Sequence, residues 1–239
     1  GSSEVGKILI KQSSSTVKKL SMELGGNAPF IIFDDADIDS AVEGVMLSKF
    51  RNSGQTCICA NRIYVQKRIY KIFLEKFISK VKSQKVGPGL DTSVEIGPLI
   101  NKDATSKVLN ILDDALNKGA KILLGGKKHS QGDNFIEPTI VTNISDNMLI
   151  CSTEIFGPVA AVYSFDDEKE IIKTANNTRA GLAAYFYGKD NSKIWRTAEA
   201  LEYGMVGVNT GFISTNLAPF GGIKESGYGR EGSKYGINE

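Results

Sequence analysis

Two short stretches of the sequence hold residue types that can carry out covalent chemistry. The stretch FRNSGQTCICANR, residues 50–62, contains Cys57 and Cys59, two of only three cysteines in the chain. A nucleophilic cysteine needs donors for a developing oxyanion and a route to its thiolate. Gly54 permits a backbone whose peptide N–H groups turn toward a ligand, so Cys57 is a candidate nucleophile with its own N–H as an oxyanion donor. Inert burial is the alternative for both cysteines.

The second stretch, MELGGN, places the carboxylate of Glu23 at the end of an apolar segment, directly before two glycines. Partial burial raises the proton affinity of a carboxylate, as a general base requires, although a glutamate in a salt bridge fits the same pattern. The single histidine, His129, lies in a glycine-rich polar stretch that predicts a solvated loop. The sequence therefore offers no Ser-His-Asp or Cys-His apparatus, and we expect no metal site. Glu23 is then the best base available to Cys57.

The composition is that of an ordinary globular domain. The chain has 239 residues, 41% hydrophobic and 23% charged, with a net charge of +2 and both signs alternating along it. This pattern argues against disorder and gives no electrostatic footprint for nucleic acid or an anionic membrane. No apolar run approaches the roughly 20 residues of a membrane span, and we find no signal peptide. Three cysteines make a poor disulfide framework, so we expect a cytoplasmic protein.

The elements that must position these residues alternate between strands and helices. Periodicity and turn signals predict strands at 18–26, 29–33, 62–66, 120–126, 136–141, 158–165, 182–188 and 205–209, and helices at 1–15, 34–50, 68–84, 101–118, 166–177 and 190–202. Such alternation predicts an α/β fold with a largely parallel sheet flanked by helices. The glycine-dense run 218–236 is open to two interpretations, a flexible surface loop or a shaped wall around a pocket.

Taken together, the motifs resemble those of the aldehyde dehydrogenase superfamily. MELGGNAPF is similar to the family's glutamate motif and FRNSGQTCICANR to its cysteine motif, while EIFGPV (154–159) and PFGGIKESG (219–227) are similar to two further signatures in the expected order. The resemblance implies a catalytic domain at 27–239, preceded at 1–26 by the last helix and strand of a Rossmann-type cofactor domain. It also implies that the N-terminal half and the oligomerisation strand are absent, so we expect this chain alone to be inactive.

The resemblance implies a role for each matching residue. Cys57 is expected to attack a small-molecule aldehyde, giving a thiohemiacetal and, after hydride transfer to NAD or NADP, a thioester. Glu23 is expected to activate the water that hydrolyses it, and Phe220 to line the substrate funnel. Residues expected to contact the cofactor, with its pyrophosphate at the helix start GSSEVG, are Gly1, Ser2, Gly6, Leu24, Glu154 and Phe156. The full-length protein is expected to be a homodimer or homotetramer.

The segments FRNSGQTCICANR, FIS and GREGSKYGI are most similar to succinate-semialdehyde dehydrogenases. In that group Arg51 is expected to hold the substrate's distal carboxylate, assisted by Ser214, because a guanidinium can grip a carboxylate in two places. The alternatives are a surface ion pair for Arg51 and, for the protein, a dehydrogenase of glutarate semialdehyde or a betaine-type aldehyde, or a non-catalytic structural protein.

The spacing of Cys57 and Cys59 also suggests a redox hypothesis. On an extended backbone, residues two apart lie on one side of the chain, which would allow a strained disulfide. Such a bond would consume the nucleophile and switch activity off reversibly. The alternative is that Cys59 only packs.

Overall fold

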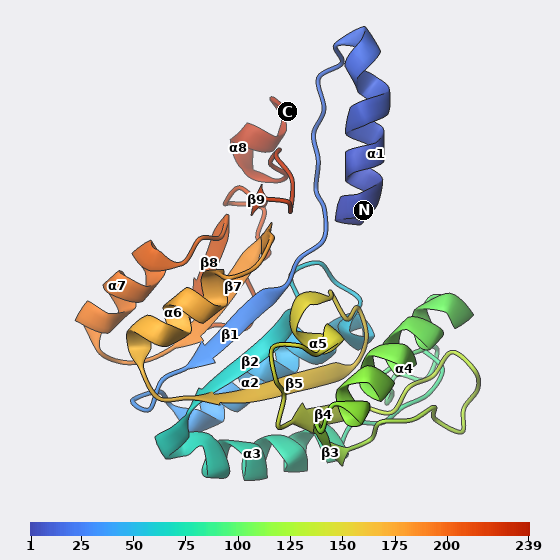
Figure 1. Cartoon of the computed structure of the whole chain (residues 1–239), viewed down its shortest axis with the longest axis vertical. Helices are drawn as coiled ribbons and strands as arrows, with labels where there is room; N and C mark the ends of the chain where they lie inside the picture. The colour runs from blue at the N-terminus through green and yellow to red at the C-terminus, as the bar shows by residue number, and fades with distance from the viewer.

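Seven strands form one sheet, in the order β3-β4-β5-β2-β1-β7-β8, in the computed structural model, which describes residues 1–239 (Figure 1). Neighbouring strands are parallel except for β3, which pairs antiparallel with β4 at one edge. The strands are β1 (Ala28–Ile32), β2 (Ala60–Gln66), β3 (Lys121–Leu124), β4 (Thr139–Thr142), β5 (Val159–Phe165), β7 (Ala183–Tyr187) and β8 (Met205–Val208). The predicted α/β fold with a largely parallel sheet is confirmed.

Helices cover both faces of this sheet (Figure 1). Helices α2 (Ile38–Phe50) and α3 (Lys67–Lys82) pack on one face, against side chains such as Phe30 and Ile63. On the opposite face, α6 (Glu168–Asn176) and α7 (Asn191–Ala200) pack against Ile31 and Phe186, while α4 (Lys102–Asn117) and α5 (Leu149–Ser152) cover β4 and β5. Because both faces are covered, β1 is buried at all five positions and reads as an unbroken apolar run.

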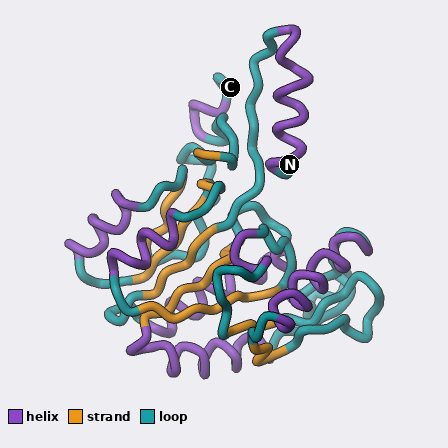
Figure 2. The backbone as a smooth tube through the Cα atoms, in the orientation of Figure 1, coloured by secondary structure: helices purple, strands orange, loops and turns teal.

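The first helix, α1 (Ser3–Ser13), rises away from the sheet together with the extended segment that follows it (Figures 1 and 2). A short 3₁₀ turn, η1 (Ser14–Thr16), connects the two. The apolar face predicted for this helix exists, but Val5, Ile8 and Leu9 are 45–55% exposed because nothing in this chain packs on them.

The strand predicted at 18–26 is wrong. This segment is extended but forms no β-ladder, since its neighbour is the irregular C-terminal segment rather than a strand. The Met22 N–H donates to the Tyr228 carbonyl (2.7 Å) and the Leu24 N–H to the Ser226 carbonyl (3.0 Å). Two alternating bonds hold the segment in place and leave Glu23 between them.

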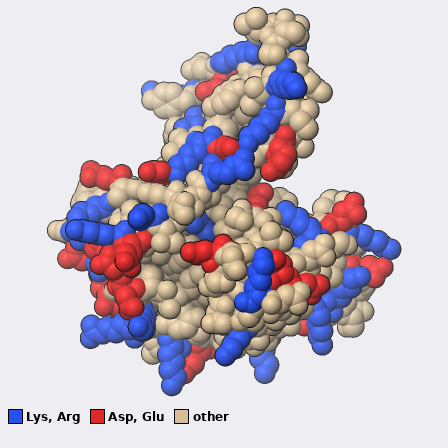
Figure 3. All heavy atoms as spheres, in the orientation of Figure 1, with Lys and Arg blue, Asp and Glu red and all other residues tan.

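The remaining elements are short. The two-residue strands β6 (Ala180–Gly181) and β9 (Ile223–Lys224) pair antiparallel, η2 (Arg51–Gly54) follows α2, and α8 (Ser233–Gly236) lies near the C-terminus. Lysine and arginine side chains are interspersed with acidic ones over the face seen in Figure 3. None of the helices combines the length and apolar character that a membrane crossing requires.

Candidate active site

The four motifs meet around one cavity of about 750 Å³, at the amino ends of β1, β2 and β5. Glu23 lies before β1, Cys57 before β2 and Glu154 before β5. Because these strands are parallel neighbours, the three residues come together at the amino-terminal ends of the strands. Ten residues singled out in the sequence line this cavity: Gly1, Ser2, Glu23, Leu24, Arg51, Cys57, Glu154, Phe156, Ser214 and Phe220. Gly6 and Cys59 do not line it.

A left-handed turn presents the cysteine loop to the cavity. After α2 ends, Asn52, Ser53 and Gly54 adopt φ values of 51°, 57° and 75° in succession. The strain at the first two is offset by side-chain bonds, because Asn52 Nδ2 donates to the Gln55 carbonyl (3.1 Å) and Ser53 Oγ to the Gly97 carbonyl (3.0 Å). A Cβ on Gly54 would overlap the carbonyl of Gly157 in the EIFGPV motif, so only glycine fits.

The two cysteines of this loop have different environments. Residues 56–59 form a turn, with the Cys59 N–H donating to the Thr56 carbonyl (3.1 Å), and both cysteines are free thiols. The extended backbone assumed by the disulfide hypothesis is therefore wrong, and a disulfide would require the turn to open. Cys59 is fully buried and its Sγ lies 3.4 Å from the Lys49 carbonyl. Burial raises the pKa of its thiol although the buried Lys49 ammonium acts against it, so Cys59 is a packing residue in this conformation.

Three carboxylates control the ionisation of the cavity. Burial, followed by the negative fields of Glu154 and Glu23, raises the pKa of the Cys57 thiol. Burial also raises the pKa of Glu23 to about 7, with Glu231 adding repulsion and Arg230 acting against it. Both carboxylate oxygens of Glu23 are buried without a hydrogen-bond partner. Glu23 therefore has no salt bridge, and its proton affinity suits a general base near neutral pH.

Glu231 is a site residue that the sequence alone did not reveal. It lines the same cavity, on the glycine-dense C-terminal run, and forms an isolated antiparallel bridge with Phe220. Their N–H groups donate to each other's carbonyls at 2.7 and 2.8 Å. This bridge fixes part of the run 218–236 as a wall of the cavity, which favours the second of the two interpretations of that run.

A buried pair of amides joins three motifs behind the cavity. Asn61 Nδ2 donates to Asn27 Oδ1 (2.7 Å) and to the Thr153 carbonyl (2.9 Å), while Asn61 Oδ1 accepts from the Ile155 N–H (3.1 Å). Asn61 thus holds both neighbours of Glu154. The Glu154 carboxylate in turn accepts from the Gly26 N–H (3.0 Å), while its burial raises its pKa. This network fixes Glu154 at the rim of the cavity.

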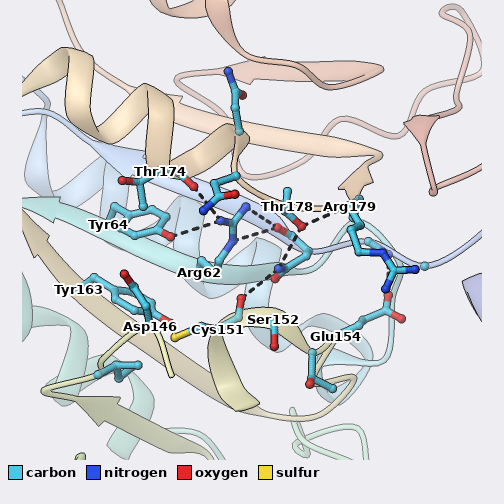
Figure 4. Close-up of a pocket in the computed structure, with 18 of the residues that line it drawn as sticks. Arg62, Tyr64, Asp146, Cys151, Ser152, Glu154, Tyr163, Thr174, Thr178 and Arg179 are labelled. Carbon is cyan, nitrogen blue, oxygen red and sulfur yellow. Dashed lines mark hydrogen bonds between the residues drawn. The ribbon is translucent and has the colours of Figure 1, made fainter. Parts of the chain in front are cut away.

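A second, more polar hollow of about 1,100 Å³ lies behind this network (Figure 4). Its floor carries Arg62, whose guanidinium donates to the Asn27 carbonyl through Nε (3.2 Å) and Nη2 (3.0 Å). The same group donates to the carbonyls of Thr174 and Ala175 and to the Tyr203 hydroxyl. These acceptors satisfy the guanidinium, so Arg62 holds the glutamate motif in position rather than offering free donors to a ligand.

The start of α1 reaches the cavity that holds Cys57 and Glu23, which is where a cofactor anion was expected. Gly1 and Ser2 line the cavity, and Ser2 Oγ caps the helix by accepting from the Val5 N–H (3.3 Å). A helix start and the rim carboxylate of Glu154 suit the phosphates and the ribose hydroxyls of a dinucleotide, respectively. Gly6 instead lets α1 pack closely on Leu24, whose side chain a Cβ there would overlap. No group of three or more His, Cys, Asp and Glu side chains is arranged to hold a metal ion.

Arg51 lies at the mouth of the cavity, with Ser214 also in its lining. Its side chain is exposed and forms no ion pair within the chain, contrary to the surface ion-pair alternative. Its guanidinium carbon lies 4.9 Å from the centre of the Phe212 ring. Phe212 was not singled out individually from the sequence, because the contact joins residues that are distant along the chain.

Comparison with known proteins places the chain in a family. The sequence model of the aldehyde dehydrogenase family matches residues 1–239. The chain is 59% identical to the mitochondrial succinate-semialdehyde dehydrogenase of Oryza sativa subsp. japonica and 55% identical to the succinate-semialdehyde dehydrogenase (NADP(+)) of Escherichia coli, over all 239 residues but only 45% and 50% of those proteins.

A solved structure gives the same result. The crystal structure of succinate-semialdehyde dehydrogenase from Burkholderia pseudomallei matches with a TM-score of 0.98 and 54% identity, covering 100% of this chain and 49% of that one. The chain spans about half the length of the relatives it matches. Fold, motif order and sequence identity thus agree, and the chain belongs to the aldehyde dehydrogenase family.

Proposed function

We propose that this chain is the catalytic part of an NAD- or NADP-dependent aldehyde dehydrogenase that oxidises succinate semialdehyde to succinate. The observation that carries the proposal is one cavity that holds a cysteine, an unpartnered glutamate with a pKa of about 7, and an unpaired arginine at its mouth. The relatives named as succinate-semialdehyde dehydrogenases support the substrate. One of them is named for NADP.

The chain's own residues would perform the covalent steps. Glu23 takes the proton of the Cys57 thiol and releases it to solvent, the Cys57 sulfur attacks the aldehyde carbon, and the Cys57 N–H stabilises the oxyanion of the thiohemiacetal. The bound cofactor would supply the hydride acceptor, with Glu154, Phe156 and the helix start at Ser2 holding it. The carbonyl carbon then stays on sulfur as a thioester. Glu23 takes a proton from water, the hydroxide displaces the thiolate, and the product leaves as a carboxylate.

Arg51 supports a substrate that carries a second carboxylate. Its exposed, unpaired guanidinium would bind the distal carboxylate at the cavity mouth, with Ser214 as a further donor, while Phe220 lines the path to Cys57. A betaine-type aldehyde carries a positive charge, which this arginine would repel. Glutarate semialdehyde, one methylene longer, is the second candidate, because a glutarate-semialdehyde dehydrogenase of Pseudomonas aeruginosa is 54% identical over the whole chain.

The half-length match supports a longer protein. We propose that residues 27–239 form the catalytic domain and residues 1–26 belong to a cofactor domain, which would cover the exposed apolar face of α1. On this proposal the isolated chain is inactive, and the complete enzyme is a homodimer or homotetramer. The cytoplasmic location stays a prediction, and the rice relative is named as mitochondrial.

The proposal is tested in the complete enzyme by separating acylation from hydrolysis. With succinate semialdehyde, Glu23→Gln should release one equivalent of reduced cofactor in a first turnover that is slower than that of the native enzyme at neutral pH, because the Cys57 thiol loses its base, and should then stop because the thioester is not hydrolysed. Cys57→Ser should give no first turnover. A Glu23→Gln enzyme with undiminished steady-state turnover, or rapid turnover by Cys57→Ser, contradicts the proposal. An alkylation-resistant Cys57 in the native enzyme would instead favour a non-catalytic protein.

A further inference from the structure

The contact between Arg51 and Phe212 suggests how the cavity recognises its substrate. Arg51 follows the last turn of α2, and Phe212 lies in the loop after β8. The guanidinium carbon lies over the ring at 4.9 Å from its centre, within the range of a cation–π interaction. No hydrogen bond or ion pair within the chain holds this guanidinium, so the ring is the contact that fixes it.

The loop that carries Phe212 is itself firmly held. Thr210 Oγ1 accepts from the Phe212 N–H (3.2 Å) and donates to the Phe212 carbonyl (3.0 Å). A Cβ on Gly211 would overlap the carbonyl of Gly44, so the loop packs directly on the backbone of α2. Asn209 anchors its start by exchanging two hydrogen bonds with the Gly188 backbone, at 3.0 and 2.9 Å.

This anchoring matters because Arg51 extends from the end of the same helix. The loop that carries the ring packs on α2, and the arginine follows directly after α2. The relative position of the two groups is therefore set by this helix rather than by a flexible surface loop. A free arginine side chain loses rotamer entropy when it binds a ligand. Contact with a fixed ring restricts the side chain beforehand and so reduces that loss.

The contact with the ring also leaves donors of the guanidinium free. A guanidinium carries five N–H groups, and none of those of Arg51 donates to an oxygen of this chain, so donors remain to grip a carboxylate. Ser214, two residues after Phe212, lines the same cavity and is carried by the same loop. One loop would then supply both the support for the arginine and a second donor.

We propose that Phe212 is a positioning residue that fixes the Arg51 guanidinium and thereby sets the preference for aldehydes with a distal carboxylate. This inference rests on the proposed function of Arg51 as the carboxylate-binding group. Phe212 is 41% exposed, so a cation–π interaction at this site contributes at the lower end of the known range. Its loss corresponds to about a two- to five-fold change in specificity.

The test is a double-mutant cycle in the complete enzyme. The variants are Phe212→Leu, Phe212→Tyr, Arg51→Ala and Phe212→Leu with Arg51→Ala, each assayed with succinate semialdehyde and with butanal, an uncharged aldehyde of the same length. The readout is the ratio of kcat/KM for the two substrates. Phe212→Leu should lower this ratio about two- to five-fold, mainly through KM, and Phe212→Tyr should preserve it because the ring remains. In the Arg51→Ala background, Phe212→Leu should leave the ratio unchanged.

The outcomes separate this inference from the proposed function. If Arg51→Ala lowers the ratio but Phe212→Leu lowers both kcat/KM values equally, or lowers the ratio as much without Arg51 as with it, the positioning role is wrong. If Arg51→Ala itself leaves the ratio unchanged, the proposed carboxylate site is wrong and the inference falls with it. Phe212→Tyr behaving like Phe212→Leu would show that the apolar fit of the ring, rather than its π face, is what matters, and would also overturn the inference.

Discussion

Glu23 should reduce the stability of the protein at neutral and alkaline pH. Its carboxylate oxygens are buried without a hydrogen-bond partner, and the pKa rises from 4.5 to about 7, chiefly through burial. The folded state therefore holds this proton more tightly than the unfolded state does. Stability is lost as the pH rises from 4.5 through 7, and the loss is complete above 7. Glu23→Gln cannot ionise and escapes this penalty.

The size of the effect follows from the shift. At 1.36 kcal/mol per pKa unit, a rise from 4.5 to about 7 corresponds to about 3.4 kcal/mol as an upper bound. Glu23 is partly exposed, so solvent screening reduces the penalty to roughly 1.5 kcal/mol. Glu23→Gln should thus be about 1.5 kcal/mol more stable than the native chain at pH 8.5, and less than about 0.5 kcal/mol more stable at pH 4.5.

Equilibrium urea unfolding at the two pH values measures this difference. The midpoint of Glu23→Gln should rise by about 0.5–0.8 M at pH 8.5 for a chain of this size. Glu225→Gln is the matched control, because Glu225 pairs with Lys7 (2.9 Å) and Arg179 (2.6 Å), which lower its pKa. That variant should lose stability at pH 8.5. If Glu23→Gln is no more stabilising at pH 8.5 than at pH 4.5, the description of Glu23 as an unpaired, desolvated base is wrong.

Three further variants test other parts of the site. Glu231→Gln should shift the acid limb of the pH profile of kcat to lower pH, because Glu231 helps to raise the pKa of Glu23, the proposed base for thioester hydrolysis. An unchanged pH profile of kcat would contradict this. Gly54→Ala should lower the free energy of unfolding by more than about 1 kcal/mol, since φ is +75° and the new Cβ meets the Gly157 carbonyl; urea unfolding measures it. Asn61→Ala should cost about 1–3 kcal/mol by leaving the buried Ile155 N–H and Asn27 amide unpaired, and an unchanged urea midpoint would show that water replaces the amide.

The sequence predicted local elements well because their causes are local. The helix at 34–50 was expected from its aspartates and its apolar spacing, and Asp37 does cap α2 by accepting from the Ser40 N–H. The segment 18–26 shows where this reasoning fails. Its alternation was real, since Met22 and Leu24 are buried and Ser21 is exposed. Whether such a segment becomes a strand depends on the neighbour it pairs with, which periodicity does not specify.

The residues of the candidate site also fall into two groups, those that a local motif reveals and those that only the fold brings to the site. Cys57 and Glu23 were found because a motif carries each of them in a few consecutive residues. The sequence did not reveal Glu231 and Phe212 individually, because the repulsion between Glu231 and Glu23 and the contact between Phe212 and Arg51 join residues far apart in the chain. The position of the site was also not predicted by the general tendency of α/β sheets, which bind ligands at the carboxyl ends of their strands. Here the motifs precede β1, β2 and β5, so the amino ends form the cavity.

In the proposed mechanism, the arrangement of the ionisable groups gives one carboxylate two steps, the deprotonation of Cys57 and the activation of water. The pKa of Cys57 is raised, so the resting group is a thiol whose proton must leave before sulfur attacks. A glutamate of ordinary pKa is too weak a base for this near neutral pH, whereas one near 7 matches the medium. His129 lies in a separate loop, and Glu154 already accepts from Gly26. Among the carboxylates that line the cavity, Glu23 is the one with both oxygens buried and without a hydrogen-bond partner, so the burial that makes it costly to the fold also gives it the proton affinity of a base near neutral pH.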